Sequence, residues 1–181
     1  MAHWLRQPRA AILGAAVLAA AALVACRAPP DPNAPTRLTD EVSVSPQVPL
    51  AKVKAVSEAG FRTIVNLRVD GETPGQPSYA DMQHAAMEAK LAYGFVPLKK
   101  SGPIAPVSVE ALASTLKRMP KPALLYAESK QRAAHAWALA EASKSGGLDA
   151  AAIAKAVKEA GPPEEDFSAE IAARIAARKS R

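Results

Sequence analysis

Residues 122–132 read Pro-Ala-Leu-Leu-Tyr-Ala-Glu-Ser-Lys-Gln-Arg, and this stretch decides the fold. Its first five residues are almost entirely apolar, which is typical of a strand buried on both faces at the centre of a parallel sheet. A helix is expected to begin near Arg132 and to run to about Ser145. In open parallel sheets, ligands bind where a strand ends and the next helix begins, so this junction is the first candidate for a functional site.

The sequence on both sides of this stretch alternates between strand-like and helix-like segments. Apolar and β-branched residues predict further strands at 42–44, 62–67 and 94–98. Apolar periodicity and capping residues predict helices at 50–59, 78–91, 107–119, 149–160 and about 164–179. The alternation predicts an α/β domain with a mainly parallel sheet flanked by helices.

Residues 1–25 have the parts of a secretory signal. Arg6 and Arg9 precede an uncharged, mostly apolar run that ends at Ala25. The run is about 16 residues long, shorter than the ~20 that a membrane-spanning helix needs. It leads into Leu-Val-Ala-Cys26, which is similar to the lipobox of bacterial lipoproteins, and Cys26 is the single cysteine of the chain.

Cys26 is therefore the expected site of lipidation by acyl chains such as palmitate, and the alternative is a free or buried thiol. Each buried methylene contributes about 0.8 kcal/mol, so two or three chains would hold the protein on a membrane. Residues 26–37 carry four prolines and are expected to form an extended tether. Arg27, in place of an acidic residue, favours the outer membrane. We expect a lipid-anchored, periplasm-facing protein of the cell envelope.

The rest of the chain is long enough for one domain, which we expect at 38–161. The 23 Lys and Arg residues and the 17 Asp and Glu residues give a formal net charge of +6. This excess is moderate, and aromatic and basic residues do not alternate, so nucleic acid is not expected as a partner. No metal-ligand spacing is found, and no metal or cofactor is expected.

Residues 162–181 are expected to form a basic C-terminal helix. Ile171 and Ile175 lie on a narrow apolar stripe, and Arg174 and Arg178 are beside it. The helix could pack on the domain, or it could bind a membrane surface or a partner.

Several segments together resemble one known family. They are Leu38–Gln47, Ala59–Arg68, Trp137–Ala140 and the run Asp-Gly-Glu-Thr-Pro-Gly-Gln-Pro-Ser at 70–78. They are similar to the phosphatase-like domain that is also found fused to beta-lactamase-like hydrolases, a branch of the cysteine-dependent phosphatase superfamily. The resemblance covers roughly residues 38–161, and it implies the fold of protein tyrosine and dual-specificity phosphatases.

In this family the loop after the central strand reads approximately Tyr-Cys-Arg-Ser/Thr-Gly-x-Arg-Ser. The resemblance implies that the cysteine thiolate attacks phosphorus while backbone N–H groups and the arginine hold the phosphoryl oxygens. Here Tyr126, Ser129 and Arg132 match the pattern, but Ala127 stands at the position of the nucleophile. Cysteine-dependent catalysis is therefore not expected.

The other changes in this loop also weaken a phosphate site. Glu128 replaces the first arginine, Lys130 replaces the glycine, and Gln131 lies at the variable position. A carboxylate beside an anion would repel it by about 4 kcal/mol at ~4 Å and an effective dielectric of 20. The remaining candidates for anion binding are Arg132, Ser129, Lys130 and Arg68.

Arg132 could hold an anion at the start of its helix, or it could pair with Glu128 and close the pocket. Asp70 is the best remaining candidate for a general acid, although it could instead order its loop. His135 and Lys99-Lys100 are further candidates near the junction, but packing or solvation explains each of them better than a role in the site.

We expect an inactive phosphatase-like domain that binds or scaffolds a protein partner or a phosphorylated ligand at the membrane. The alternative is an active phosphoester hydrolase with a nucleophile other than cysteine, for which Ser129 is the candidate. A third hypothesis is an envelope protein whose pocket has no ligand.

Overall fold

The computed structural model describes residue 31 and residues 33–179. The predicted signal and Cys26 lie outside the described residues. The elements, in chain order, are β1 (Thr36–Arg37), β2 (Val42–Ser45), the 3-10 helix η1 (Leu50–Lys52), α1 (Val53–Glu58), β3 (Thr63–Arg68), α2 (Tyr79–Glu88), β4 (Ala92–Leu98), α3 (Pro106–Arg118), β5 (Ala123–Tyr126), α4 (Lys130–Ser143), α5 (Ala150–Glu159) and α6 (Ser168–Lys179).

The strands form one sheet in the order β1-β2-β5-β3-β4. β5 lies at the centre and pairs in parallel with β2 on one edge and with β3 on the other. β4 continues the parallel pairing beside β3, whereas β1 pairs antiparallel with β2 at the opposite edge. The mainly parallel α/β sheet that the sequence predicted is confirmed.

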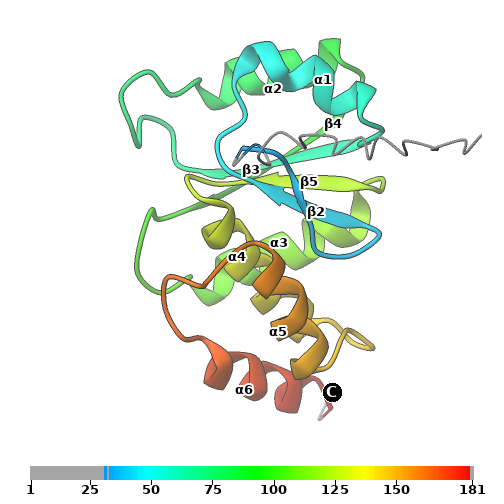
Figure 1. The fold of residues 1–181 in the computed structure, drawn as a ribbon, viewed down its shortest axis with the longest axis vertical. Coiled ribbons are helices and arrows are strands. Elements are labelled where there is room, and N and C mark those ends of the chain that lie inside the picture. Colours follow the sequence, from blue (N-terminus) through cyan, green and yellow to red (C-terminus); the bar gives the residue numbers. More distant parts are fainter. Residues whose placement is uncertain (1–30, 32, 180–181) are drawn as a thin grey trace, which may run out of the picture. The chain divides into compact units, whose positions relative to one another are not determined.

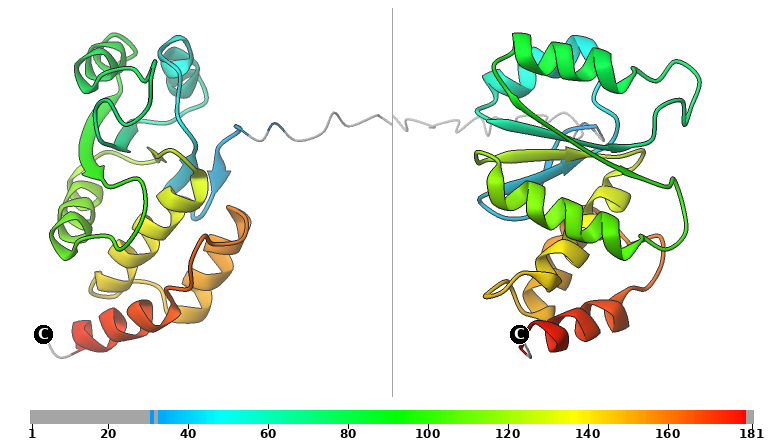
Figure 2. Two further views of the ribbon diagram at one scale, coloured as in Figure 1. Left: turned by 90° about the vertical axis from the view of Figure 1, so that its left-hand side faces the viewer. Right: turned by 180° about the vertical axis from the view of Figure 1, so that it is seen from behind.

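Helices cover both faces of this sheet. Figure 1 shows α1 and α2 on one face and α3 and α4 on the other, with α5 and α6 beyond α4; the two turned views agree (Figure 2). Successive strand residues point to opposite faces. Ile64 and Leu124 therefore join the core under α1 and α2, and Val65 and Leu125 join the core under the other helices.

Two segments differ from the sequence prediction. Thr36 and Arg37, expected in the tether, form the edge strand β1 opposite Val44 and Ser43. The last helix, expected from about residue 164, begins at Ser168. The Asp166 carboxylate accepts a hydrogen bond from the Ser168 N–H at 2.9 Å, which forms an Asx turn just before the helix. Two prolines at 162–163 favour extended backbone immediately before. Residues 164–167 are thereby left in the loop.

α6 packs against α4 and belongs to the same compact unit as the sheet. Ile171 is buried in the core, and Ile175 is partly buried against it. Arg174 donates to the Ser143 hydroxyl at 3.2 Å, and Arg178 donates to the Leu148 carbonyl at 2.7 Å. The apolar stripe of this helix is therefore used for packing within the domain.

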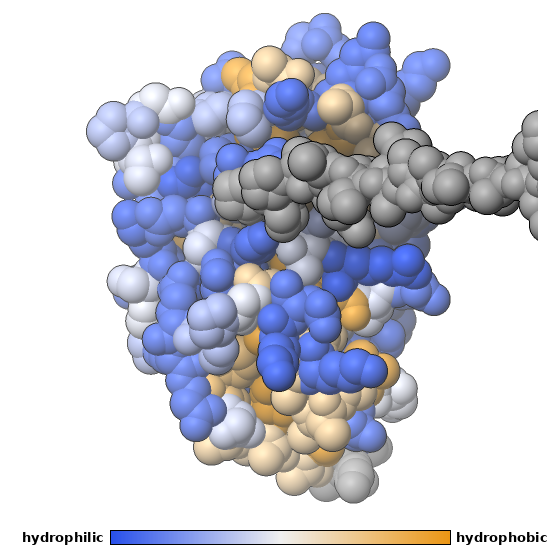
Figure 3. All heavy atoms as spheres, in the orientation of Figure 1, coloured by the Kyte–Doolittle hydropathy of each residue, from blue (hydrophilic) through white to orange (hydrophobic). Residues whose placement is uncertain are grey.

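The lower part of the molecule in Figure 3 shows pale apolar surface between charged groups. Exposed alanines of α5 and α6 belong to this part of the domain, and their small side chains form no large apolar protrusion. Within residues 31 and 33–179, no helix combines the length and the apolar character needed to cross a membrane.

The central position of β5 gives a first prediction. Leu124 is fully buried, and its replacement by Ala removes contacts that the surrounding sheet and helices cannot replace. We expect Leu124→Ala to lower the free energy of unfolding by about 2–5 kcal/mol. Val107→Ala is the control, because Val107 is 71% exposed and should change stability by less than about 0.5 kcal/mol. Urea denaturation measures both, and equal losses would contradict the placement of β5.

Candidate functional site

The junction between β5 and α4 is the strand, turn and helix start that the sequence indicated. Three residues connect the two elements, and the first of them, Ala127, is 2% exposed. The hydroxyl of Ser129 caps the helix by accepting a hydrogen bond from the Arg132 N–H at 3.0 Å. The N-terminus of a helix carries partial positive charge and free N–H groups, so this position attracts anionic oxygens.

At the position that the sequence resemblance assigns to the nucleophile, the side chain is the methyl group of Ala127, which cannot attack phosphorus. Cys26 is the only cysteine of the chain, and it precedes the folded domain by sequence. The domain therefore contains no thiol, and cysteine-dependent phosphoryl transfer has no nucleophile here.

The loop after β4 contacts the junction at two points. The Lys100 ammonium lies 2.6 Å from a carboxylate oxygen of Glu128, and the Lys99 carbonyl accepts a hydrogen bond from Arg132 Nη2 at 2.9 Å. Glu128 is therefore paired with Lys100 and not with Arg132. Its side chain is partly exposed, so its charge is also screened by solvent.

Arg132 is held inward by a different carboxylate. Its side chain is 4% exposed, and Nη1 lies 3.7 Å from Glu165 Oε1. Its Nε is buried without a hydrogen-bond partner among the described residues. The guanidinium thus faces an acidic group of its own chain, but not all of its donors are used.

This carboxylate comes from the loop between α5 and α6. We name residues 162–167, Pro-Pro-Glu-Glu-Asp-Phe, the acidic segment. Glu164 Oε1 accepts a hydrogen bond from the Ser129 hydroxyl at 2.7 Å, and Glu165 Oε1 lies 3.8 Å from His135 Nδ1. Two carboxylates of the acidic segment therefore lie at the helix start, against the groups that would hold an anion.

An aromatic contact holds the end of the acidic segment. The Phe167 ring stacks on His135 at 4.0 Å between centroids and 9° between planes. His135 is 6% exposed; burial, and then the charge of Arg132, lower the pKa of its imidazole. The neutral ring is favoured at pH 7, which suits stacking on an apolar partner. His135 Nε2 is also buried without a hydrogen-bond partner among the described residues.

Gly161 lets the chain pass close to the start of α4. Its φ is +105°, in the region that favours glycine, and a Cβ here would lie 2.9 Å from Gln131 Nε2. The sequence Gly-Pro-Pro at 161–163 contains no signal for the residues that this part of the chain contacts. Sequence analysis therefore missed the acidic segment as part of the site.

Arg68, a predicted anion ligand, is engaged by its own loop. It is 4% exposed and donates to Glu72 at 2.7 Å, to Gln47 at 2.6 Å and to Thr73 at 3.0 Å. These bonds use all three side-chain nitrogens and neutralise the charge with a buried carboxylate. The guanidinium holds Glu72 and Thr73 of the loop, and these three bonds leave two of its five N–H donors.

The other predicted residues also have local partners. Lys130 Nζ lies 3.5 Å from the Thr36 hydroxyl, on the side of β1. Asp70 accepts a hydrogen bond from the Tyr79 N–H at 2.7 Å and so orders the loop at the start of α2. Across the described part of the chain, no group of three or more His, Cys, Asp or Glu residues could hold a metal ion.

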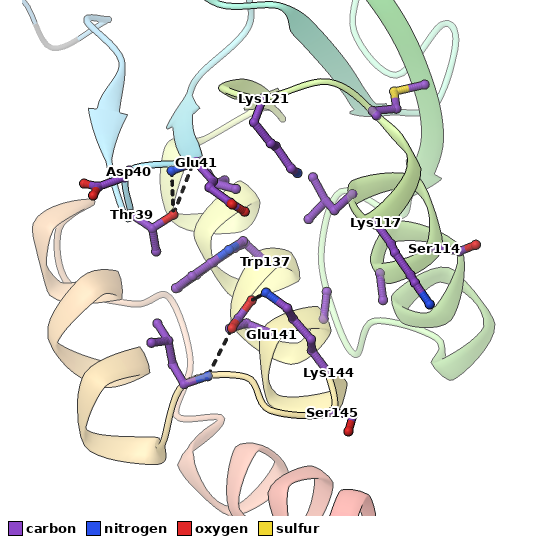
Figure 4. A pocket seen from close by; sticks show the side chains of 16 residues that line it. Thr39, Asp40, Glu41, Ser114, Lys117, Lys121, Trp137, Glu141, Lys144 and Ser145 are labelled. Carbon is purple, nitrogen blue, oxygen red and sulfur yellow. Dashed lines mark hydrogen bonds and ion pairs between the residues drawn. The ribbon is translucent and has the colours of Figure 1, made fainter.

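A cavity of about 880 Å³ lies elsewhere, at the amino ends of β2 and β5 (Figure 4). Trp137 and Ala140 lie against it, and its rim carries three lysines and three acidic residues: Lys117, Lys121, Lys144, Asp40, Glu41 and Glu141. Burial lowers the pKa of Lys121. The rim charges balance, and none of the residues of the β5–α4 junction line the cavity, so its size does not identify it as the site.

Comparison with known proteins assigns most of this domain to one family. Residues 36–144 match the family model of the beta-lactamase hydrolase-like protein, phosphatase-like domain. Beta-lactamase hydrolase-like proteins of Agrobacterium fabrum and Xylella fastidiosa are each 32% identical, over 107 and 104 residues. These matches cover 59% and 58% of this chain but 24% of each relative, so the chain spans about a quarter of the length of the curated relatives it matches.

Solved structures show the same fold at lower sequence identity. A structure from Neisseria meningitidis, named as a candidate phosphatase, has a TM-score of 0.65 and 22% identity, covering 77% of this chain and 96% of that one. TpbA of P. aeruginosa, solved in complex with phosphotyrosine, has a TM-score of 0.58 and 13% identity, covering 83% and 94%. The family match spans more than half of the chain, and the resemblance seen in the sequence is confirmed: this protein belongs to the family of the beta-lactamase hydrolase-like protein, phosphatase-like domain.

Proposed function

We propose that this protein is a lipid-anchored protein of the cell envelope whose phosphatase-like domain binds a partner and does not hydrolyse phosphoesters. The observation that carries the proposal is the β5–α4 junction. Ala127 offers a buried methyl group where the family presents a thiol, and Arg132 is turned toward the Lys99 carbonyl and Glu165.

The loss of the nucleophile is accompanied by changes in the groups that would bind phosphate. The Glu164 carboxylate accepts the hydrogen bond of the Ser129 hydroxyl, and the Glu165 carboxylate lies beside Arg132. A phosphate that entered this space would meet two carboxylates at short range, which is unfavourable by several kcal/mol at an effective dielectric of about 20. A domain with such a site could bind a partner through its outer surface, or at the junction after the acidic segment is displaced.

The competing function is hydrolysis with Ser129 as the nucleophile. The carboxylate of Glu164, 2.7 Å from the Ser129 hydroxyl, is a group that could accept its proton. The same hydroxyl, however, accepts the capping hydrogen bond of α4 and lies at the start of the helix, two residues after the position of the family's nucleophile. Attack by this oxygen would require both of its contacts to change.

The proposal predicts no enzyme-like turnover. Purified domain should hydrolyse para-nitrophenyl phosphate no faster than its Arg132→Gln variant, because the only step that the arginine could assist lacks a nucleophile. Colorimetric assay at pH 5 to 8, with a chelator present, measures this. Turnover near 1 s⁻¹, within the usual enzyme range, would contradict the proposal. Loss of such turnover in Ser129→Ala would favour the competing function.

Thiol chemistry should return when the site is rebuilt. We expect measurable hydrolysis of the same aryl phosphate by the combination Ala127→Cys, Glu128→Arg and Lys130→Gly in a background that also carries Glu164→Gln and Glu165→Gln. The new thiolate would supply the nucleophile, and loss of the three nearby carboxylates would admit the dianion. The matched control carries Ala127→Ser in the same background and should be inactive. A folded thiol variant without iodoacetamide-sensitive turnover would count against the alignment of Ala127.

The anchor is tested separately from the domain. Cys26→Ser should abolish incorporation of radiolabelled palmitate and release the protein from the membrane fraction, because the sulfur is the expected attachment point of the lipid. Arg27→Lys is the control and should be labelled like the parent. Label that persists in Cys26→Ser would show that Cys26 is not the acylated residue.

A further inference from the structure

The acidic segment contacts the β5–α4 junction as a peptide ligand would. Its contacts are of three kinds: Glu164 with the Ser129 hydroxyl at 2.7 Å, Glu165 with Arg132 at 3.7 Å, and Phe167 stacked on His135 at 4.0 Å. Hydrogen bond, ion pair and aromatic contact thus follow one another along four consecutive residues. The backbone of these residues is neither helix nor strand.

The receiving surface is built from buried groups and not from one helix end alone. Arg132 and His135 are 4% and 6% exposed, and both come from α4, one turn apart. Each retains a buried nitrogen without a hydrogen-bond partner among the described residues, Nε of Arg132 and Nε2 of His135. Buried polar atoms are nearly always paired, so the resident carboxylates use this surface incompletely.

Glu164 and Glu165 can leave the junction while Phe167 stays partly buried against the core. Glu164 and Glu165 are exposed on their outer side, and Glu165 retains 47% side-chain exposure. α6 is held to the domain by other contacts: the burial of Ile171, and the bonds from Arg174 to Ser143 and from Arg178 to Leu148. Removing the two carboxylates therefore breaks contacts of the acidic segment but not those that anchor α6.

We propose that the acidic segment is a resident copy of the ligand of this site, and that the site binds an extended acidic peptide with an aromatic residue two or three positions after its acidic pair. This inference rests on the proposed binding function and names the class of partner. The intramolecular copy competes with the external peptide, so the apparent affinity of the parent protein is reduced by the fraction of molecules in which the site is open.

The test uses a fluorescein-labelled peptide, Pro-Pro-Glu-Glu-Asp-Phe-Ser, and fluorescence polarisation. The receptor is the soluble form of the protein, in which Cys26→Ser prevents acylation, carrying Glu164→Gln and Glu165→Gln. We expect this receptor to bind the peptide at least tenfold more tightly than the same protein with Glu164 and Glu165 intact. Adding Arg132→Gln should remove the gain, and peptides with Gln for both Glu residues or Ala for Phe should bind at least tenfold more weakly.

Inorganic phosphate at 20 mM distinguishes a peptide site from a site for anions alone. If phosphate displaces the parent peptide and the peptide with Ala in place of Phe to the same extent, the site recognises only the anionic oxygens. This result would overturn the proposal. A receptor that unfolds cooperatively yet binds the peptide no better than the intact protein would also overturn it. The single variant Glu164→Gln, which removes the charge that faces Ser129 and leaves Glu165 in place, should show an intermediate gain and serves if the double variant is unstable.

Failure of this experiment is distinguishable from failure of the proposed function. Peptide binding does not depend on hydrolysis, and the aryl phosphate assay does not depend on the peptide. If the protein neither hydrolyses aryl phosphate nor binds the peptide, the proposed noncatalytic function stands and the peptide is excluded as its ligand. A protein that hydrolyses aryl phosphate would remove the noncatalytic function itself.

Discussion

The double pairing of β5 is the constraint on which the rest of the structure depends. This strand is hydrogen-bonded in parallel to β2 and β3 and is buried on both faces. Its direction and depth fix the point at which α4 must begin, and with it the placement of Ser129, Arg132 and His135. The α4 residues that follow are mostly small and buried, so the helix lies close to the sheet and cannot shift without opening the core.

Under the proposed function, the placement of the helix start explains how a phosphatase-like domain could lose its chemistry and keep its geometry. The partial charge at the N-terminus of a helix comes from the backbone and persists when Ala replaces the nucleophile. An anionic group is favourable at such a position, and here the chain supplies Glu164 and Glu165. The proposed binding function follows from the missing thiol. The proposed peptide ligand follows from the two glutamates that lie at the start of α4.

Much of the fold could be predicted from the sequence, because the signals are local. The apolar run ending at Tyr126 predicted the central strand and the junction, and both are observed, although α4 begins at Lys130 and not near Arg132. The site could be predicted only in part. Arg68 reaches Gln47, 21 positions away, and Ser129 reaches Glu164, 35 positions away, so neither partner can be identified from local periodicity. Glu164 also continued an apparent helical pattern, which hid the loop formed by the acidic segment.

The most direct measurement is a crystal structure of the domain grown in high phosphate. The account predicts that Glu164 still accepts the hydrogen bond of the Ser129 hydroxyl and that Arg132 still faces Glu165, with no phosphate at the start of α4. A phosphate bound by Ser129 and Arg132, with residues 164–167 displaced, would contradict the central claim that carboxylates of the chain itself close this site.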